Sequence, residues 1–290
     1  MLRFIWVIVS CLFLIMYYVP KMSYYARHPE KYGEDICYQM AQVMCNHVRR
    51  RAFIKTVATG MENLPKEGGY IMYANHQGKY DVLGVIVSHD KPITYVMDAK
   101  RSKLFIADQL TDLVKAQRLD KEDIKQQVQV INDVSTEIKA GRRYILFPEG
   151  GYDHSHNELK EFMPGSFKIA KKAKCPIVPV VLYDSFKPFE GWSLRRVTTQ
   201  LAFLEPIPYE VIADKTTTEI RDMVVDKIQR KLDTMETMNC WYRYMDNYSE
   251  RAGHVDDLPV RGLRKLGVDY IKSGEYNIKG YLTTKTRIGK

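Results

Sequence analysis

A histidine and an aspartate stand five positions apart in one polar segment, Asn75-His76-Gln77-Gly78-Lys79-Tyr80-Asp81. An imidazole can take a proton from a hydroxyl group, and a carboxylate beside it can fix the ring tautomer that does so. The preceding run predicts a strand that ends at Ala74, and a helix is predicted to open at Tyr80, so the loop can fold Asp81 back onto His76. On these residues alone, a loop histidine with a helix-capping aspartate is the alternative.

A second polar segment, Phe147-Pro148-Glu149-Gly150, follows another short apolar run. A glutamate after a buried strand can accept hydrogen bonds from substrate hydroxyls. A glycine lets a phosphate approach the backbone closely. Transfer of an acyl group from a thioester to a hydroxyl needs a base, a partner that orients it and donors for the oxyanion, and His76 and Asp81 can supply the first two.

The two segments together resemble the signatures of the glycerolipid acyltransferases, the family that includes 1-acyl-glycerol-3-phosphate acyltransferase. The resemblance runs over residues 69–182, with four blocks in the family's order. The first block implies that His76 is the general base, that Asp81 holds it in place, and that Asn75 beside it contacts substrate. The third block implies that Glu149 and Gly150 help to hold the glycerol phosphate.

The other two blocks imply further binding residues. The second block of the family ends in an arginine that binds the acceptor phosphate, and its nearest counterpart is Arg118, although Gln117 stands where the family has aspartate. Lys100, upstream, is a second candidate for the phosphate, with a solvated basic turn as the alternative. Pro179 lies in the fourth block, which the family associates with the acyl-binding region.

One departure from the family concerns the acceptor. Many members carry an arginine two residues after the glycine of the third block, where this chain has Tyr152. The next residues, Asp153, His154 and His156, could be offered as a metal site. Three such residues in one polar loop are more often solvated, and no metal is predicted.

The elements that must position these residues alternate between strand and helix. Strands are predicted at Gly69–Ala74, Ile93–Asp98, Arg143–Phe147, Ile177–Leu182 and Val197–Pro208, and helices at Val82–Ser88 and Thr216–Asp233. This rhythm predicts an α/β fold with a mostly parallel central sheet flanked by helices. Ligand sites of such sheets lie at the carboxyl ends of the strands, where the blocks fall.

The N-terminal region predicts association with a membrane. The largely apolar run Phe4–Val19 is about long enough for an uncleaved anchor, and tyrosines and basic residues follow it. From Ile36 to Arg51 an amphipathic helix is predicted, either packed on the core or lying on the membrane surface. The predicted division is a hydrophobic anchor at 1–20, an amphipathic membrane-associated region at 21–52, an α/β acyltransferase domain at 53–240 and a basic appendage of unknown role at 241–290.

Composition narrows the class of protein further. The formal net charge of +9 favours anionic partners, and the five scattered cysteines favour a reducing compartment. The basic residues are dispersed, so nucleic-acid binding is not predicted. The chain lacks the G-x-S-x-G of serine hydrolases and the G-x-G-x-x-G of dinucleotide enzymes.

The resemblance therefore implies a membrane-associated enzyme with its active site at the cytoplasmic membrane surface. It would transfer a fatty acyl group from acyl-CoA or acyl carrier protein to lysophosphatidic acid, forming phosphatidic acid among membrane lipids. No cofactor is expected. The alternatives are another lysophospholipid or alcohol as acceptor, and a non-catalytic membrane protein that binds anionic lipid.

Overall fold

The computed structural model describes residues 2–103, 107–152, 155–190 and 192–249. The chain divides into two compact units, Met1–Leu232 and Asp233–Lys290. All the predicted site residues lie in the first unit. Residues 250–290, most of the predicted appendage, lie outside the described part of the chain.

A seven-stranded sheet forms the centre of the first unit, in the order β1-β7-β6-β2-β5-β3-β4. The strands are β1 (Ile54–Thr59), β2 (Tyr70–Ala74), β3 (Thr94–Asp98), β4 (Gln117–Leu119), β5 (Arg143–Leu146), β6 (Ile177–Tyr183) and β7 (Val197–Phe203). Neighbouring strands pair in parallel except β6 with β7. The predicted α/β fold with a mostly parallel sheet is confirmed.

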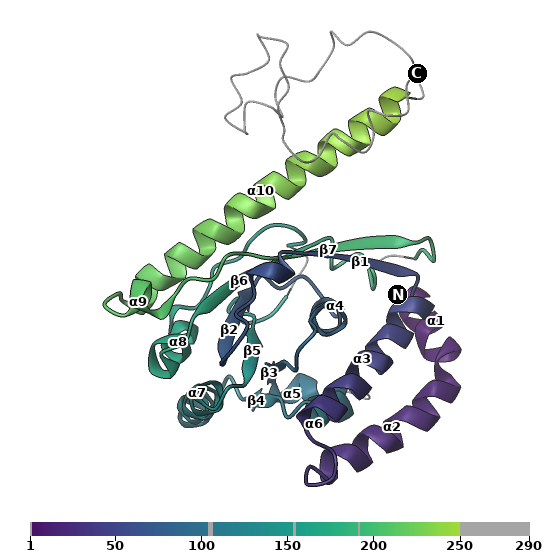
Figure 1. Ribbon diagram of the computed structural model, residues 1–290. Helices are drawn as coiled ribbons and strands as arrows, with labels where there is room; N and C mark the ends of the chain where they lie inside the picture. Colours follow the sequence, from purple (N-terminus) through teal and green to yellow (C-terminus); the bar gives the residue numbers. More distant parts are fainter. Residues whose placement is uncertain (1, 104–106, 153–154, 191, 250–290) are drawn as a thin grey trace, which may run out of the picture. The chain divides into compact units, whose positions relative to one another are not determined.

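Helices cover both faces of the sheet (Figure 1). The helices after the first strand are α4 (Asp81–Ser88), α5 (Ala99–Ser102), α6 (Ala107–Leu113), α7 (Ile124–Lys139), α8 (Lys168–Ala173), α9 (Tyr209–Ile212) and α10 (Thr217–Ser249), with short 3-10 turns at Met61–Asn63 and Pro164–Phe167. The pair α7 and α8 lies on one face, and α3 (Glu34–Arg51), α4 and α6 lie on the other. Because β2 and β6 are buried along their whole lengths, their sequences are nearly continuous apolar runs.

Five parallel strands point the same way and end at one edge of the sheet. Their last residues are Ala74, Asp98, Leu119, Leu146 and Tyr183. The loops that follow these strands therefore meet at this edge, which is where a ligand site of an open α/β sheet is expected.

The N-terminal run forms two helices rather than one, α1 (Leu2–Ser10) and α2 (Leu12–Arg27). Among the described helices, none is by itself long and apolar enough to cross a membrane. Taken together, α1 and α2 have the length and apolar composition of a span, but they are bent by 72° at the break between them. The second helix runs through Pro20 to Arg27, past the predicted end of the anchor.

The structure does not separate residues 1–52 from the α/β domain, although the sequence suggested such a division. The side chain of Arg3 is buried and donates hydrogen bonds to the carbonyl oxygens of Lys187, Pro188 and Arg195. Val7 on α1, Cys11 at the break between the helices, and Ile15 and Met22 on α2 join the same core at helical spacing. Burial of this stripe explains why the two helices belong to the first unit.

Helix α3 packs on the core, which was one of the two alternatives for its amphipathic pattern. Its buried face contacts α4, β1, α2 and α6 and comprises Cys37, Tyr38, Met40, Ala41, Met44 and Cys45.

Two element boundaries differ from the predicted ones. Strand β7 stops at Phe203 rather than Pro208, and α10 continues to Ser249 rather than Asp233.

Candidate active site

His76 and Asp81 form a direct hydrogen bond. The Nδ1 atom of His76 lies 2.6 Å from Oδ2 of Asp81, whose side chain is fully buried. Because the carboxylate can only accept, the neutral ring carries its proton on Nδ1, which leaves the lone pair of Nε2 available. The predicted pair is therefore assembled as a general base with an orienting carboxylate.

The local sequence explains this geometry. Strand β2 ends at Ala74, and α4 begins at Asp81, so the aspartate occupies the first turn of a helix, where an anionic side chain is favourable. Its Oδ2 atom also accepts hydrogen bonds from the backbone N–H groups of Gln77, at 2.6 Å, and Gly78, at 2.9 Å. One carboxylate oxygen thus closes the loop and orients the histidine.

Two aromatic rings hold the imidazole from other sides. The ring of Phe147 stacks on His76 with a centroid separation of 4.5 Å, and the ring of Tyr152 contacts its edge at 4.8 Å. The side chain of His76 keeps 17% of its surface exposed, so the ring is confined but still open to a substrate.

Asn75, a predicted substrate contact, is held by the neighbouring strand. Its side chain is buried, and both amide atoms bond to the backbone of Leu182 on β6, with Nδ2 donating at 2.9 Å and Oδ1 accepting at 2.8 Å. These bonds fix the end of β2 to the neighbouring strand. The predicted contact of Asn75 with substrate stays a prediction.

Gln77 was not among the predicted site residues, and the structure gives it a similar task. Its side chain is buried, with Oε1 accepting from the backbone N–H of Ser185 at 2.8 Å and Nε2 donating to Asn157 at 2.9 Å. The His76 loop is thereby tied to the loop after β6. The partners are distant in sequence, so no local pattern could have identified them.

Glu149 lies beside the pair and is only 8% exposed. Burial raises the pKa of Glu149 to about 7, and the charge of Asp81 acts in the same direction, against opposing backbone N–H groups of His76 and Lys160. Its Oε2 atom is buried and has no hydrogen-bond partner among the residues that the structure describes. A buried orphan acceptor next to the base is suited to bind a polar group of a substrate.

Gly150 is required by its backbone and by its surroundings. Its φ of 70° lies in the left-handed region, and a Cβ atom there would come within 2.5 Å of the Cε atom of Met163. The carbonyl oxygen of Gly150 accepts a hydrogen bond of 2.5 Å from Lys121. A larger residue at position 150 would hold a strained left-handed backbone, and the end of the Met163 side chain would have to move aside.

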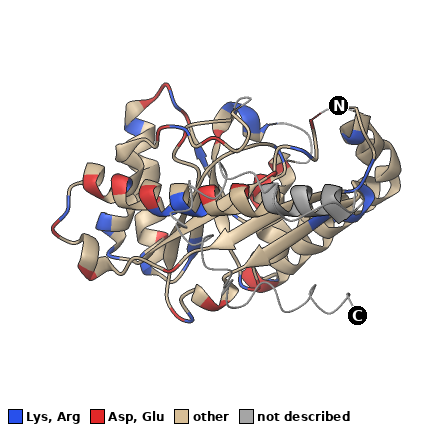
Figure 2. Ribbon diagram, turned by 90° about the horizontal axis from the view of Figure 1, so that it is seen from above, with Lys and Arg blue, Asp and Glu red and all other residues tan. Residues whose placement is uncertain are grey.

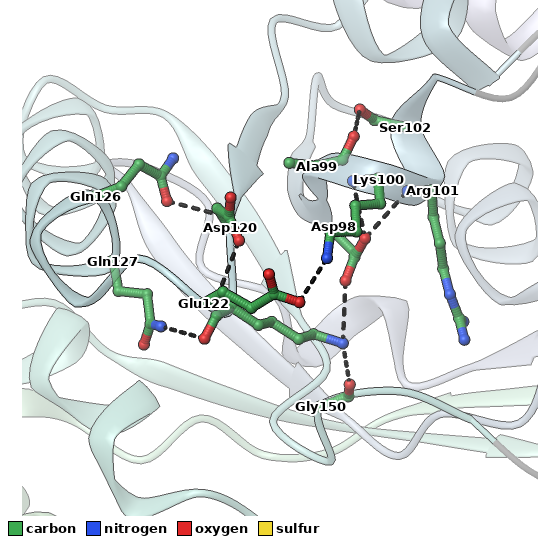
Figure 3. Close-up of polar contacts among 11 residues, drawn as sticks. Asp98, Ala99, Lys100, Arg101, Ser102, Asp120, Glu122, Gln126, Gln127 and Gly150 are labelled. Atoms are coloured by element: carbon green, nitrogen blue, oxygen red, sulfur yellow. Dashed lines mark hydrogen bonds and ion pairs between the residues drawn. The ribbon is translucent and has the colours of Figure 1, made fainter.

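Lys121 links two of the loops at the site (Figure 3). Its Nζ atom lies 3.2 Å from Asp98 in addition to the bond with Gly150. Lys100, a predicted phosphate ligand, is exposed and pairs with Glu122 at 2.5 Å. Lys121 was missed because the strand before it, β4, has only three residues and leaves little signal in the sequence.

Arg118 is held by carboxylates on a nearby helix. Its Nη2 atom pairs with Asp108 at 2.9 Å and with Asp112 at 2.6 Å, and its Nε donates to Ser102 at 3.2 Å. These contacts of Arg118 thus connect β4 with α5 and α6 rather than with the His76 loop. Its role in binding phosphate stays a prediction.

Pro179 lies within β6, buried and paired with Tyr73 of β2. Its predicted role in acyl binding also stays a prediction.

Of the residues that could be offered as a metal site, Asp153 and His154 lie outside the described residues. Within the part of the chain that the structure describes, no group of three His, Cys, Asp or Glu side chains could hold a metal ion.

The family model described as "Acyltransferase" matches residues 55–183. Among curated proteins, the chain is 28% identical over 222 residues to 1-acyl-sn-glycerol-3-phosphate acyltransferase alpha of Ovis aries, covering 73% of each chain. It is 27% identical over 219 residues to the Homo sapiens protein of the same name, covering 73% of this chain and 74% of that one. A 1-acyl-sn-glycerol-3-phosphate acyltransferase of Borreliella burgdorferi is 28% identical over 188 residues, which is 61% of this chain and 73% of that protein.

A solved structure shows the same fold. It is the crystal structure of the 1-acyl-sn-glycerophosphate (LPA) acyltransferase PlsC from Thermotoga maritima, which superposes with a TM-score of 0.64 at 19% sequence identity. The match covers 80% of this chain and 95% of that one.

Proposed function

We propose that this chain, whose residues 55–183 match the acyltransferase family model, transfers a fatty acyl group to the free hydroxyl of 1-acyl-sn-glycerol-3-phosphate, forming phosphatidic acid. The observation that carries this proposal is the oriented His76–Asp81 pair, because a protein that only binds lipid has no need of a base held by a buried carboxylate. The names of the relatives supply the acceptor.

The chemistry follows from the position of the base. Nε2 of His76 takes the proton of the acceptor hydroxyl as the oxygen attacks the thioester carbonyl. A carbon–oxygen bond forms, the carbon–sulfur bond breaks, and the imidazolium returns its proton to the leaving thiolate. No acyl group passes through the protein in this scheme, so no acyl-enzyme is expected.

The acyl donor is acyl-CoA or acyl carrier protein, and no cofactor takes part. The test is acyl transfer from each labelled donor, by protein purified in detergent, to a panel of acceptors that includes 1-acyl-glycerol-3-phosphate, other lysophospholipids and simple alcohols. Label in phosphatidic acid is the expected result. Label in another acceptor would correct the substrate, and no transfer from either donor would favour the lipid-binding alternative.

Glu149 should make the affinity for this acceptor depend on pH. Its raised pKa of about 7 means that the side chain is neutral below pH 7 and negative above it. A negative side chain in a site for a phosphate ester weakens binding. The neutral fraction falls from about one half to about one tenth between pH 7 and pH 8, so we expect the acceptor KM to rise about fivefold over that interval. Initial rates at several pH values measure it.

The matched control for this prediction is Glu149→Gln, whose side chain is neutral at every pH. The titration of the acceptor phosphate affects both proteins equally. The difference between their two profiles of acceptor KM against pH is therefore due to the titration of Glu149. A wild-type KM that follows the profile of the Glu149→Gln variant throughout would contradict the assignment.

The N-terminal helices are the part of the protein suited to a membrane surface. Large apolar side chains are exposed on α1 and α2, namely Leu2, Phe4, Ile5, Trp6, Ile8, Val9, Leu12, Phe13, Met16 and Tyr17. These helices carry basic but no acidic residues (Figure 2). An apolar face with basic and aromatic residues at its edge favours the headgroup region of an anionic membrane. We infer a membrane-associated enzyme with its active site at the cytoplasmic membrane surface.

Polar substitutions on this face should release the protein from membranes. Phe13 and Met16 are 84% and 67% exposed, so Phe13→Asn with Met16→Asn should leave the fold intact and lower the bound fraction in vesicle co-sedimentation about tenfold or more. Ile124→Asn on α7, at 76% exposure, removes a similar exposed side chain elsewhere. Equal binding of the double variant and this control would contradict the inference.

A further inference from the structure

We propose that Arg101, seated on the ring of Tyr152, binds the phosphate of the acceptor and thereby sets the preference for phosphorylated over unphosphorylated acceptors. This inference rests on the proposed function. It assigns the charged part of the acceptor to a residue from the β3–α5 junction.

Arg101 is separated from the base by a single side chain. Its guanidinium carbon lies 5.0 Å from the centroid of the Tyr152 ring, and that ring lies 4.8 Å from the ring of His76. In the acceptor, the reacting hydroxyl and the phosphate are separated by two carbon atoms and one ester oxygen. When the hydroxyl contacts His76, the phosphate must therefore lie near the imidazole, about as far away as the neighbouring side chain.

The backbone of Arg101 is fixed against the loop that contains Tyr152 (Figure 3). Oδ1 of Asp98 accepts hydrogen bonds from the backbone N–H groups of Lys100 and Arg101, each at 3.0 Å. The other oxygen of Asp98 pairs with Lys121, which also donates to the carbonyl oxygen of Gly150. The start of α5 and the loop at Gly150 thus form one hydrogen-bonded assembly.

The charge of Arg101 is available to a ligand, whereas three basic residues near it are paired. Lys100 pairs with Glu122, Lys121 with Asp98, and Arg118 with two aspartates on α6. Among the residues that the structure describes, no carboxylate forms an ion pair with Arg101. A guanidinium group binds phosphate oxygens in a bidentate manner, so an exposed and unpaired one is a suitable ligand for the acceptor.

Tyr152 prepares Arg101 for this contact. Stacking on an aromatic ring restricts the guanidinium before the ligand arrives and lowers the entropy lost on binding. Burial raises the pKa of Tyr152, so its hydroxyl group stays protonated and can donate a hydrogen bond. Tyr152 can thus support the binding of an anion indirectly, by holding Arg101, which contacts the anion.

The experiment measures kcat and KM for 1-acyl-glycerol-3-phosphate and for 1-acylglycerol, which lacks the phosphate, with wild type, Arg101→Gln and Arg101→Lys. Arg101→Gln should raise the KM for the phosphorylated acceptor about ten- to hundredfold, as expected for lost charge-assisted hydrogen bonds, with a change in kcat below about threefold. The preference for the phosphorylated acceptor should fall by the same factor. Arg101→Lys should recover part of it.

Arg196→Gln is the matched control, because Arg196 is also exposed but lies just before β7, beside Arg49 and Phe53. Its kinetic constants should stay within about twofold of wild type. An unchanged KM in Arg101→Gln, or an equal loss for both acceptors, would overturn the inference while leaving the proposed function intact. A wild-type enzyme that does not acylate the phosphorylated acceptor would refute the proposed function itself.

Discussion

His76→Ala is expected to lower the rate of acyl transfer by about 10²–10⁴-fold, the usual contribution of a positioned general base. The neutral imidazole donates from Nδ1 to Asp81, so Nε2 is the atom that takes the hydroxyl proton. Alanine leaves no group that can do so. The acceptor hydroxyl must then lose its proton to water during the attack, which raises the barrier of the chemical step itself.

The fold should survive this substitution. Asp81 keeps the hydrogen bonds from the N–H groups of Gln77 and Gly78, so its buried charge does not lose all its partners. Thermal melting should therefore show a folded variant. The fall in rate should appear in kcat, measured at saturating acceptor. A His76→Ala protein that is folded and retains more than about a tenth of the wild-type kcat would contradict the role of base.

Asp81→Asn is expected to have the second-largest effect, a fall in kcat of about 10²–10⁴-fold with little change in acceptor KM. The carboxylate selects the tautomer with the proton on Nδ1 and stabilises the imidazolium that forms during transfer. An asparagine is neutral, so it stabilises the imidazolium far less than the carboxylate does, even with its carbonyl oxygen in the place of Oδ2.

Asparagine is the informative replacement because its carbonyl oxygen can still accept from the backbone N–H groups of Gln77 and Gly78. The loop at the start of α4 should therefore keep its shape. Asp81→Ala would remove these bonds as well and would confound orientation with folding. A larger rise in acceptor KM than fall in kcat for Asp81→Asn would show that the carboxylate binds substrate instead of orienting the histidine.

Local sequence was sufficient to predict that His76 and Asp81 come together, whereas their roles as base and orienting carboxylate came from the resemblance to a family. Strand β2 ends at Ala74 and α4 starts at Asp81, as the hydrophobic pattern indicated, and only the short loop between them had to close. Glu149 and Gly150 could be placed for the same reason, since they follow β5 after only Phe147 and Pro148. Parallel strands bring both segments to one edge of the sheet.

The residues that could not be predicted depend on contacts between distant parts of the chain. Gln77 bonds to Ser185, and Lys121 bonds to Gly150, only because β4, β5 and β6 take their places in the sheet. The contact of Arg101 with Tyr152 has the same origin. Spacing along the sequence contains no information on strand order, so these partners needed the fold.

The N-terminal region illustrates a different limit. Its apolar composition indicated an anchor, yet the same composition also supplies a stripe that packs on the domain, including Val7 and Ile15. Hydrophobicity shows that a side chain avoids water, but it does not distinguish a protein core from a membrane. The side chains that remain exposed, such as Phe13, are known only from the structure.

One competition measurement tests the account most directly. Equal amounts of 1-acyl-glycerol-3-phosphate and 1-acylglycerol are incubated with labelled acyl-CoA and protein purified in detergent, and the products and the protein are analysed for label. The account predicts that label enters phosphatidic acid in large excess over diacylglycerol, that none is bound to the protein, and that His76→Ala reduces both products to background. Excess label in diacylglycerol, a labelled protein intermediate, or undiminished transfer by His76→Ala would contradict it.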